Sequence, residues 1–309
     1  MHRLHRRKSR ERGGGVMSLE DIILLTQKQL FKRLMAQRCI YNKDSYVLIP
    51  GTAPVMLLAH LDTVHKEKVR TICYDRNHDV LMSPQGIGGD DRCGVYALLE
   101  VSKRSKVKPW LLFLCDEEIG CVGARQFCSD HSAGYLPKEL DDLKFLIEID
   151  RKGSTDAVYY DCDNEEFEDY ITSKGFKTDF GSCSDISYVA PELGVAAVNL
   201  SSGYYNAHTL HEYIVVSELK QTIDKVVGIV EESDKLPKYE YIEAVYYNYC
   251  NYKWSEYDGY WTKEDKKFQR DCLLELGHTE KELDAIEKEF GYLAIDEMYW
   301  DECVNEWRR

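Results

Sequence analysis

Histidine or acidic residues end three of the apolar runs in this chain. The first run, LLAHLDTVH, ends with His60 and Asp62. The other two runs end with acidic residues, namely Asp116, Glu117, Glu118 and Asp150. A carboxylate or an imidazole at the end of a buried strand is energetically costly unless another group pairs with it. The sequence therefore predicts that another group binds these side chains and offsets the cost of burying them.

A bound metal cluster would be such a group. Acidic groups gathered from several strands repel one another, and cations remove that cost. Histidine and carboxylate ligands without cysteine suit zinc, cobalt or manganese. Two metal ions about 3.5 to 4 Å apart, sharing one carboxylate, would also neutralise the excess negative charge. We therefore expect two divalent ions, zinc first, with cobalt or manganese as alternatives.

The apolar runs are expected to form the sheet that positions these residues. Strands are predicted over residues 55–62, 110–118, 144–150 and 194–203. Helices are predicted over residues 19–35, 91–105, 122–130, 183–193 and 216–236. This alternation is typical of a three-layer α/β/α sandwich with a mostly parallel central sheet. Open sheets of this kind bind ligands outside the carboxyl ends of their strands, where the acidic residues and histidine stand.

Three segments are expected along the chain. Residues 1–16 are rich in arginine and end in three glycines, which is typical of a disordered tail or of a mis-assigned start before Met17. Residues 17–235 would form the α/β domain that carries the histidine and acidic residues. Residues 236–309 are crowded with tyrosine and tryptophan and predict a mostly helical extension. That extension would pack on the core or form a self-interface in a homo-oligomer.

Composition excludes several classes of protein. The net charge of −14 disfavours a nucleic-acid partner, which needs a clustered cationic surface. No run of about 18 apolar residues and no signal-peptide pattern occurs, so we expect a cytoplasmic protein without a membrane partner. The eleven cysteines are scattered and form no CxxC pair, which disfavours a disulfide framework or a zinc ribbon.

Two further motifs contain potential ligands. In GIGGDDRCG, Asp90 and Asp91 open a predicted helix, and the segment does not fit a dinucleotide fingerprint. In YYNAHTLHEYI, His208 lies close to Glu212. The chain has no HExxH motif, and GSCSD lacks the spacing of a nucleophile elbow. No site role is predicted for the remaining histidines that lack supporting context, namely His65, His78, His131 and His278.

Each motif alone is common, but their order along the chain is typical of one group of enzymes. The ordered set AHLDTV, GGDDRCG, DEEIG, IEID and NAHTLHEY, between Val55 and Ile214, resembles the co-catalytic zinc exopeptidases. That clan includes tripeptidase T, the glutamate-releasing carboxypeptidases and the bacterial leucyl aminopeptidases. The resemblance implies one metal ion held by His60 and Asp150. It implies a second metal ion held by Glu118 and His208.

The same resemblance assigns three further roles. Asp90 would bridge the two metal ions, and the peptide bond between Asp90 and Asp91 would be cis. Asp62 would orient His60, as metal-bound histidines generally require. Glu117 would act as the general base toward a water shared by the two metal ions.

These features predict a metal-dependent exopeptidase that hydrolyses a terminal amide bond of a short peptide. An aminopeptidase is the first reading, and a carboxypeptidase or N-acyl amino acid deacylase is the alternative. The segments between His60 and Asp90 and between Asp150 and His208 are too short for the extra domains of larger relatives, which predicts a minimal catalytic core. An alternative outside the enzymes is a binding or scaffold protein that keeps the fold without catalytic activity. Glu117 and all five ligand positions are present, which favours the enzyme.

Overall fold

The computed structural model describes residues 5–7, 17–42, 44–181, 183–244 and 263–290, together with Tyr292, Ile295, Met298 and Tyr299. The chain divides into two compact units, Met1–Ala244 and Val245–Arg309, which we describe separately. Apart from the strand at His5–Arg7, the predicted tail lies outside the described residues, as does the tyrosine-rich segment 245–262. Within the described part of the chain, no helix has both the length and the apolar character needed to cross a membrane.

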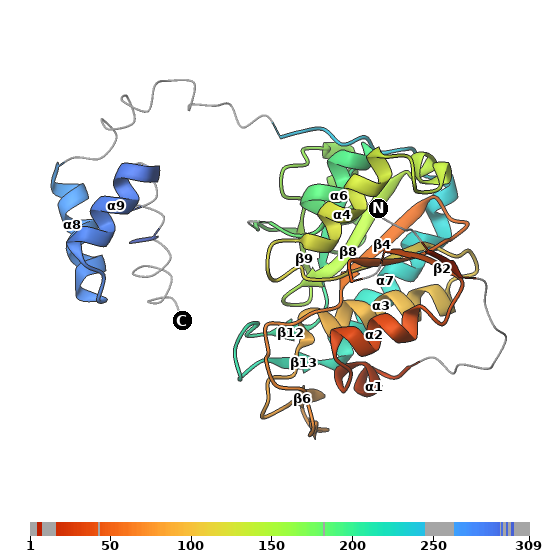
Figure 1. Cartoon of the computed structure of the whole chain (residues 1–309), viewed down its shortest axis with the longest axis horizontal. Coiled ribbons are helices and arrows are strands. Elements are labelled where there is room, and N and C mark those ends of the chain that lie inside the picture. The colour runs from red at the N-terminus through yellow and green to blue at the C-terminus, as the bar shows by residue number, and fades with distance from the viewer. Residues whose placement is uncertain are drawn as a thin grey trace. The chain divides into compact units, whose positions relative to one another are not determined.

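A mixed sheet runs through the first unit (Figure 1). Its nine strands among the described residues are, in spatial order, β1 (His5–Arg7), β2 (Cys39–Asn42), β3 (Tyr46–Ile49), β7 (Trp110–Leu114), β4 (Val55–His60), β8 (Phe145–Arg151), β11 (Ala197–Ser201), β9 (Asp156–Val158) and β10 (Lys177–Thr178). The central strands β7, β4, β8 and β11 pair in parallel. Their carboxyl ends therefore lie at one edge of the sheet.

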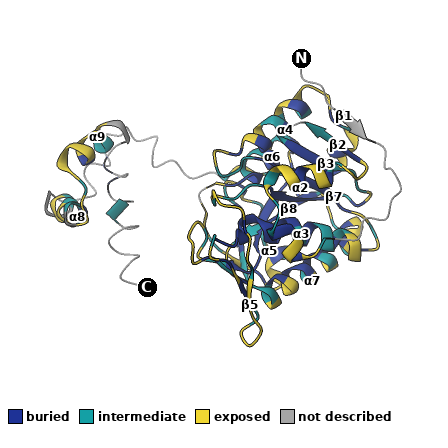
Figure 2. Cartoon of the chain, turned by 60° about the horizontal axis from the view of Figure 1, so that its bottom comes forward, coloured by how far each residue is buried: buried dark blue, intermediate teal, exposed yellow. Residues whose placement is uncertain are grey.

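Helices cover both faces of this sheet. One apolar layer contains α1 (Leu19–Ile23), α2 (Gln27–Leu34), α3 (Gly89–Arg104), α5 (Glu165–Ser173) and α7 (Val216–Glu232). The opposite layer contains α4 (Val122–Ser132) and α6 (Ile186–Leu193). Leu57 belongs to the first layer and Leu58 to the second, because neighbouring strand residues point to opposite faces. Buried strands between partly exposed helices (Figure 2) confirm the predicted three-layer α/β/α sandwich.

The structure differs from the expected elements near the amino terminus. Residues 19–35 form two helices because Thr26 begins a new one. The Thr26 hydroxyl accepts a hydrogen bond from the Gln29 amide, and the Gln29 side chain accepts one from the Thr26 amide. Such a capping box starts a helix where a single amphipathic pattern had suggested continuity. The antiparallel strands β2 and β3 were also not predicted, because each is only four residues long.

A smaller sheet connects two segments that flank the predicted site. Among the described residues it contains β12 (Tyr204–Tyr205), β13 (Tyr213–Val215), β6 (Val80–Met82) and β5 (Cys73–Asp75), in that order. The hairpin of β12 and β13 encloses residues 206–212. Strand β13 pairs with β6, which lies between His60 and Asp90 in the sequence. The sheet therefore holds the loop with His208 close to the segment that precedes Asp90.

Residues 236–244 complete the first unit after the 3₁₀ helix η2 (Ser233–Lys235). The Tyr239 amide donates to the carbonyl of Lys144 at 2.9 Å, and its carbonyl accepts from the Ala196 amide at 2.8 Å. The ring of Tyr239 packs against Phe145 and Phe167. These contacts of Tyr239 anchor the carboxyl-terminal part of this unit to the sheet. A second 3₁₀ helix, η1 (Lys138–Asp142), precedes β8.

In the second unit, the described residues form α8 (Lys263–Glu275) and α9 (Glu280–Phe290). Leu273 and Leu283 are buried in a small apolar cluster. Arg270 forms ion pairs with three acidic side chains at the start and along the length of α9, namely Glu280, Asp284 and Glu287. These helices confirm the predicted helical extension. The predicted self-interface stays a prediction.

Candidate metal centre

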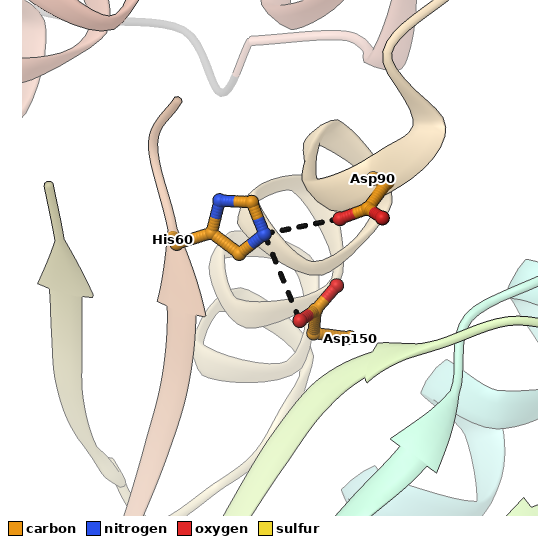
Figure 3. Close-up of side chains that lie close together, drawn as sticks. All are labelled: His60, Asp90 and Asp150. Atoms are coloured by element: carbon orange, nitrogen blue, oxygen red, sulfur yellow. Dashed lines mark hydrogen bonds and ion pairs between the residues drawn. The ribbon is translucent and has the colours of Figure 1, made fainter. Parts of the chain in front are cut away.

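Three of the predicted ligands meet at the carboxyl edge of the large sheet (Figure 3). His60 Nε2 lies 3.0 Å from Asp90 Oδ1 and 3.6 Å from Asp150 Oδ2. His60 ends β4, Asp150 lies at the end of the neighbouring parallel strand β8, and Asp90 lies in the first turn of α3. The fold thus brings together three residues that are distant in the sequence.

The second oxygen of Asp90 faces the other two predicted ligands. His208 Nε2 lies 3.2 Å from Asp90 Oδ2 and 3.2 Å from Glu118 Oε2. Glu118 follows β7, which is the other parallel neighbour of β4, and His208 comes from the hairpin of β12 and β13. The carboxylate of Asp90 therefore contacts one histidine through each of its two oxygens.

The potential ligand atoms are close enough to share metal ions. Among the described residues, three sets have ligand atoms within 4.8 Å of one another. The sets are His60 with Asp90 and Asp150, His60 with Glu117 and Glu118, and Asp90 with Glu118 and His208. All five positions that the sequence suggested as ligands lie in this one cluster.

The backbone at the start of α3 is adapted to this arrangement. The peptide bond between Asp90 and Asp91 is cis, as the resemblance implied, and both residues have non-helical backbone angles. The buried carboxylate of Asp91 accepts hydrogen bonds from the amide of Gly94 at 2.8 Å and from the amide of His60 at 3.3 Å. Asp91 therefore connects the first turn of α3 to the end of β4.

Glu212 and His65 hold the same loop from its other side. Glu212 is fully buried, and its carboxylate accepts hydrogen bonds from the amides of Gly88 and Asp90, both at 2.9 Å. His65 Nε2 lies 2.8 Å from the same carboxylate. The sequence assigned no role to His65, and only the closeness of Glu212 to His208 could have drawn attention to this pair. Together they fix the backbone that presents Asp90.

Asp62 links His60 to the loop that follows β7. Its carboxylate lies 3.2 Å from His60 Nδ1, and it accepts hydrogen bonds from the amides of Glu117 and Glu118, both at 3.1 Å. A ring nitrogen held in this way fixes the orientation of the imidazole. Asp62 thereby positions both His60 and the backbone of the two glutamates.

Electrostatics at the centre are dominated by burial and by the mutual repulsion of its acids. Burial and the neighbouring charges of Asp90 and Asp91 raise the pKa of Asp150 well above its ordinary value. Burial alone would lower the pKa of His60, but the attraction of Asp150 and hydrogen bonds to Asp62 and Asp90 raise it well above its ordinary value. Burial opposes ionisation of Asp90, yet hydrogen bonds to His208 and His60 lower its pKa.

On the more exposed side of the cluster, neighbouring charges and burial also shift the pKa values of Glu118 and His208. Burial and repulsion by Asp90 raise the pKa of Glu118 to about 7. A hydrogen bond to Asp90 raises the pKa of His208 to about 9. Protons on these groups therefore compensate part of the carboxylate charge at neutral pH. Divalent cations could take the place of those protons.

The residues fit a divalent cation on two further grounds. Glu118 Oε1 is buried and has no hydrogen-bond partner, so one oxygen remains available to a ligand. The donors are two imidazoles and three carboxylates, which suit zinc and other first-row divalent metals. A buried and unpartnered carboxylate oxygen beside a histidine is costly without such a ligand.

Glu117 lies beside the cluster and differs from its neighbour Glu118 in its surroundings. Burial and the charges of Asp90 and Asp62 raise the pKa of Glu117, although His60 opposes this. Its Oε1 accepts a weak hydrogen bond from Cys121 Sγ at 3.8 Å. A carboxylate whose pKa is raised toward the working pH is better suited to accept and donate protons than one with an ordinary pKa.

Two more buried carboxylates lie close enough to His60 to feel its charge, Glu148 in β8 and Asp185 at the start of α6. Glu148 and Asp185 are fully buried, and their four carboxylate oxygens form no well-directed hydrogen bond, although Ser184 and the Ile186 backbone lie near enough to Glu148 to oppose part of the rise in its pKa. Burial raises the pKa of Glu148 to about 8 and that of Asp185 well above its ordinary value. The sequence did not indicate either residue, because Glu148 lies inside an apolar strand and Asp185 precedes a helix.

Glu148 should make the stability of the protein without metal depend on pH. Its pKa rises from 4.5 to about 8 on folding, so the folded state binds more protons between these values and stability falls as the pH rises through them. We expect Glu148→Gln, which is uncharged, to raise the Tm above that of the wild type at pH 8. At pH 4.5 the two proteins should differ far less. Thermal unfolding in chelator at both pH values measures this effect.

The exposed Glu139→Gln variant is the control for Glu148→Gln, because it makes the same chemical change at the surface. Its Tm should follow the wild type at both pH values. One pKa unit corresponds to about 1.4 kcal/mol, so the difference at pH 8 should be on the order of a few kcal/mol. An equal change in Tm at pH 4.5 and pH 8 would contradict the raised pKa of Glu148.

The sequence and the structure were each compared with known proteins. Residues 45–211 match peptidase family M28. No curated protein sequence matches the chain. The structure of aminopeptidase PepT from Bacillus cereus is similar at 15% identity and a TM-score of 0.50, over 71% of this chain and 100% of that one. A tripeptidase from Staphylococcus aureus gives 13% identity and a TM-score of 0.49, over 72% and 100% of the two chains.

The likeness to PepT shows a shared fold, and the family match covers more than half of the chain. The matched residues contain His60, Asp90, Glu118, Asp150 and His208. The predicted resemblance to the co-catalytic zinc exopeptidases is therefore confirmed at the level of the family. The chain belongs to peptidase family M28 and is a hydrolytic metallopeptidase.

Proposed function

We propose that the protein is an aminopeptidase with a centre of two divalent metal ions. The observation that carries this proposal is the position of Asp90. Its Oδ1 lies 3.0 Å from His60 and its Oδ2 lies 3.2 Å from His208, so each oxygen faces a different group of ligands. A carboxylate placed in this way is suited to bridge two cations.

The ligands divide between two positions. His60 and Asp150 would hold one ion, Glu118 and His208 would hold the other, and Asp90 would contact both. Zinc is the first expectation, and cobalt or manganese would suit the same donors. When bound, such ions lower the pKa of a water molecule and polarise the carbonyl of the scissile amide.

The side chains around the ions would supply orientation and proton transfer. Glu117 would accept a proton from the attacking water at a carboxylate oxygen and pass it to the nitrogen of the leaving amine. Burial raises the pKa of Glu117, which favours its accepting a proton. Asp62 would fix the position of His60 relative to the loop with Glu117, since its carboxylate contacts both.

Charge near the centre favours a substrate with a free amino terminus. The loops 116–121, 179–185 and 205–212 contain acidic residues and no lysine or arginine, whereas the loop after Asp62 carries Lys66 and Lys68. Arg151, which follows Asp150, already pairs with Asp179 at 3.0 Å. A free ammonium group would be attracted to these loops, whereas a free carboxylate would be repelled. This observation supports an aminopeptidase over a carboxypeptidase or an N-acyl amino acid deacylase.

A panel of matched substrates tests this proposal. The zinc-loaded protein should hydrolyse aminoacyl p-nitroanilides and short peptides with a free amino terminus, and should not hydrolyse the same compounds after acetylation. Release of carboxyl-terminal residues from acetylated peptides, or of the acyl group from acyl amino acids, would contradict the aminopeptidase assignment. Absence of hydrolysis from the whole panel, with either zinc, cobalt or manganese, would favour the inactive scaffold.

A further inference from the structure

A cavity of about 280 Å³ lies beside the candidate metal centre. Its wall is formed by the end of α1, the start of α2, the loop 62–69 that follows β4, and the residues that precede α3. These three helices belong to one layer of the first unit (Figure 1). Asp62 and His65 are part of the wall, whereas none of the five proposed metal ligands is. The cavity is therefore separate from the metal positions and has no role in the proposed function.

Three cationic side chains line the cavity, namely Lys66, Lys68 and Arg92. Both lysines are exposed, and neither side chain forms an ion pair or a hydrogen bond with another described residue. Exposed lysines are common on protein surfaces. Here, two of them line one cavity together with a third, buried cation, in a chain whose net charge is −14.

The buried cation is the guanidinium of Arg92. The residue is 5% exposed, and its side chain donates to the carbonyls of Leu25, Leu61 and Asp62. These carbonyls hold the guanidinium at the cavity wall but carry no net charge. Among the described residues, no carboxylate oxygen lies within 4.0 Å of its nitrogens, although the carboxylates of Asp62 and Glu212 attract it over longer distances. A buried charge without a close counter-ion is costly, which favours the binding of an anion nearby.

The start of α2 adds positive electrostatic potential at the cavity. Thr26 caps this helix, and both Thr26 and the first helical residue, Gln27, line the cavity. Amides in the first turn of a helix lack partners within the helix, and the helix dipole adds a partial positive charge there. Such helix starts bind phosphate and other anions through those amides.

Two acidic side chains on the wall, Asp62 and Glu67, offset part of this charge. The Asp62 carboxylate is already engaged, since it lies 3.2 Å from His60 Nδ1 and accepts hydrogen bonds from the amides of Glu117 and Glu118. Glu67 is exposed and stands between the two lysines in the sequence. The three cations and the helix start therefore leave an excess of positive charge at the cavity.

We propose that this cavity binds a small anion that carries one phosphate group. A phosphate group has a charge of about −1.5 to −2 near neutral pH and three strong acceptor oxygens, which suits several cations and amides better than the single charge of a carboxylate. Ile23, Val69 and Ile87 on the same wall would contact the carbon atoms of a phosphate ester. The volume is below the range of about 300 to 1,000 Å³ that is usual for ligand pockets, which favours inorganic phosphate or a small ester over a nucleotide.

An anion in this cavity would influence the metal centre through two side chains. Asp62 contacts His60, and His65 contacts Glu212, which holds the backbone of Asp90. Because the proposed metal ligands do not line the cavity, the anion should bind with or without metal ions. A phosphate site at this position does not depend on the proposed aminopeptidase activity.

Isothermal titration calorimetry on the full chain tests this site, with inorganic phosphate and glycerol 3-phosphate as probes. We expect saturable binding of both at one site per chain. Tighter binding of the ester would identify an organic phosphate as the ligand, and tighter binding of inorganic phosphate would identify free phosphate. The combined variant Lys66→Gln and Lys68→Gln should bind both probes at least about 10-fold more weakly, since hydrogen bonds to charged groups contribute at least that factor. Its Tm should be unchanged, because both side chains are exposed.

The matched control is the combined variant Lys106→Gln and Lys138→Gln, which removes two exposed lysines that lie outside the cavity. It should bind both probes as the wild type does. Phosphate also binds metal ions, so the titration is repeated on the Asp90→Asn variant and on wild-type protein freed of metal by a chelator. Binding should persist in both, and the chelator-treated wild type decides the question if Asp90→Asn does not fold.

Three results would overturn the phosphate site. They are no saturable binding to the wild type, equal binding by the Lys66→Gln and Lys68→Gln variant, and loss of binding when metal is removed. A rise in KM of that variant for peptides with a free carboxyl terminus, without phosphate binding by the wild type, would assign the lysines to the substrate instead. Calorimetry detects binding rather than hydrolysis, so a failure of the proposed function would leave this result unaffected.

Discussion

Replacing Glu117 with glutamine should lower kcat by about 10² to 10⁴-fold, the range for loss of a general acid and base. The amide has nearly the same shape as the carboxylate but cannot accept the proton of the attacking water. Although the Glu117 carboxylate lies within 4.8 Å of ligand atoms of His60 and Glu118, the proposal gives it the role of base and not of ligand, so metal content should stay at the wild-type level. Steady-state kinetics on an aminoacyl p-nitroanilide, with metal content measured on the same samples, provides both values.

The control for this prediction is Glu139→Gln, which makes the same change at an exposed position. It should retain wild-type kcat and metal content. The pH profile adds a second readout, because the acidic limb of kcat/KM in the wild type should reflect a carboxyl group with a raised pKa. A Glu117→Gln variant that keeps its metal ions and its kcat would show that another group acts as the base.

Replacing Asp90 with asparagine should cause the largest loss of both metal and activity. Each oxygen of the Asp90 carboxylate faces a different histidine, and an amide provides only one oxygen acceptor and no charge. We expect kcat/KM to fall by more than about 10³-fold, because the several kcal/mol that metal ions contribute to the transition state would be lost. Metal content should fall below that of the wild type under the same dialysis.

Asp142→Asn serves as the control, since it makes the same change at an exposed site in η1. It should behave as the wild type in both measurements. Full metal content in the Asp90→Asn variant would exclude a bridging role for Asp90. Normal activity in that variant would contradict the whole assignment of the centre.

The clustering of the proposed ligands could be predicted from sequence because the elements that carry them are simple. Strands β4 and β7 are completely buried, so their apolar runs are continuous and their polar ends are easy to recognise. Parallel pairing then places His60, Glu118 and Asp150 at the same edge of the sheet. The short motifs around Asp90 and His208 became interpretable only through their order along the chain.

Other parts of the site depend on contacts that a sequence pattern does not record. His65 and Glu212 meet across 147 positions, and their role in holding the Asp90 loop follows from the pairing of β13 with β6. Glu148 lies in an apolar strand, so its burial could be predicted from the sequence. That Asp185 is a second buried carboxylate could not be predicted, because it lies far away in the sequence. The break between α1 and α2 depends on the capping box at Thr26, which competes with a longer helical pattern.

The proposed dinuclear centre is tested most directly by the metal content of the purified wild-type protein after incubation with zinc and removal of free metal. Inductively coupled plasma mass spectrometry should find about two zinc ions per chain, as a carboxylate-bridged centre requires. Cobalt or manganese should bind in the same number when zinc is withheld. A protein that retains no metal with any of the three ions would contradict the central claim that His60, Asp90, Glu118, Asp150 and His208 form a dinuclear centre.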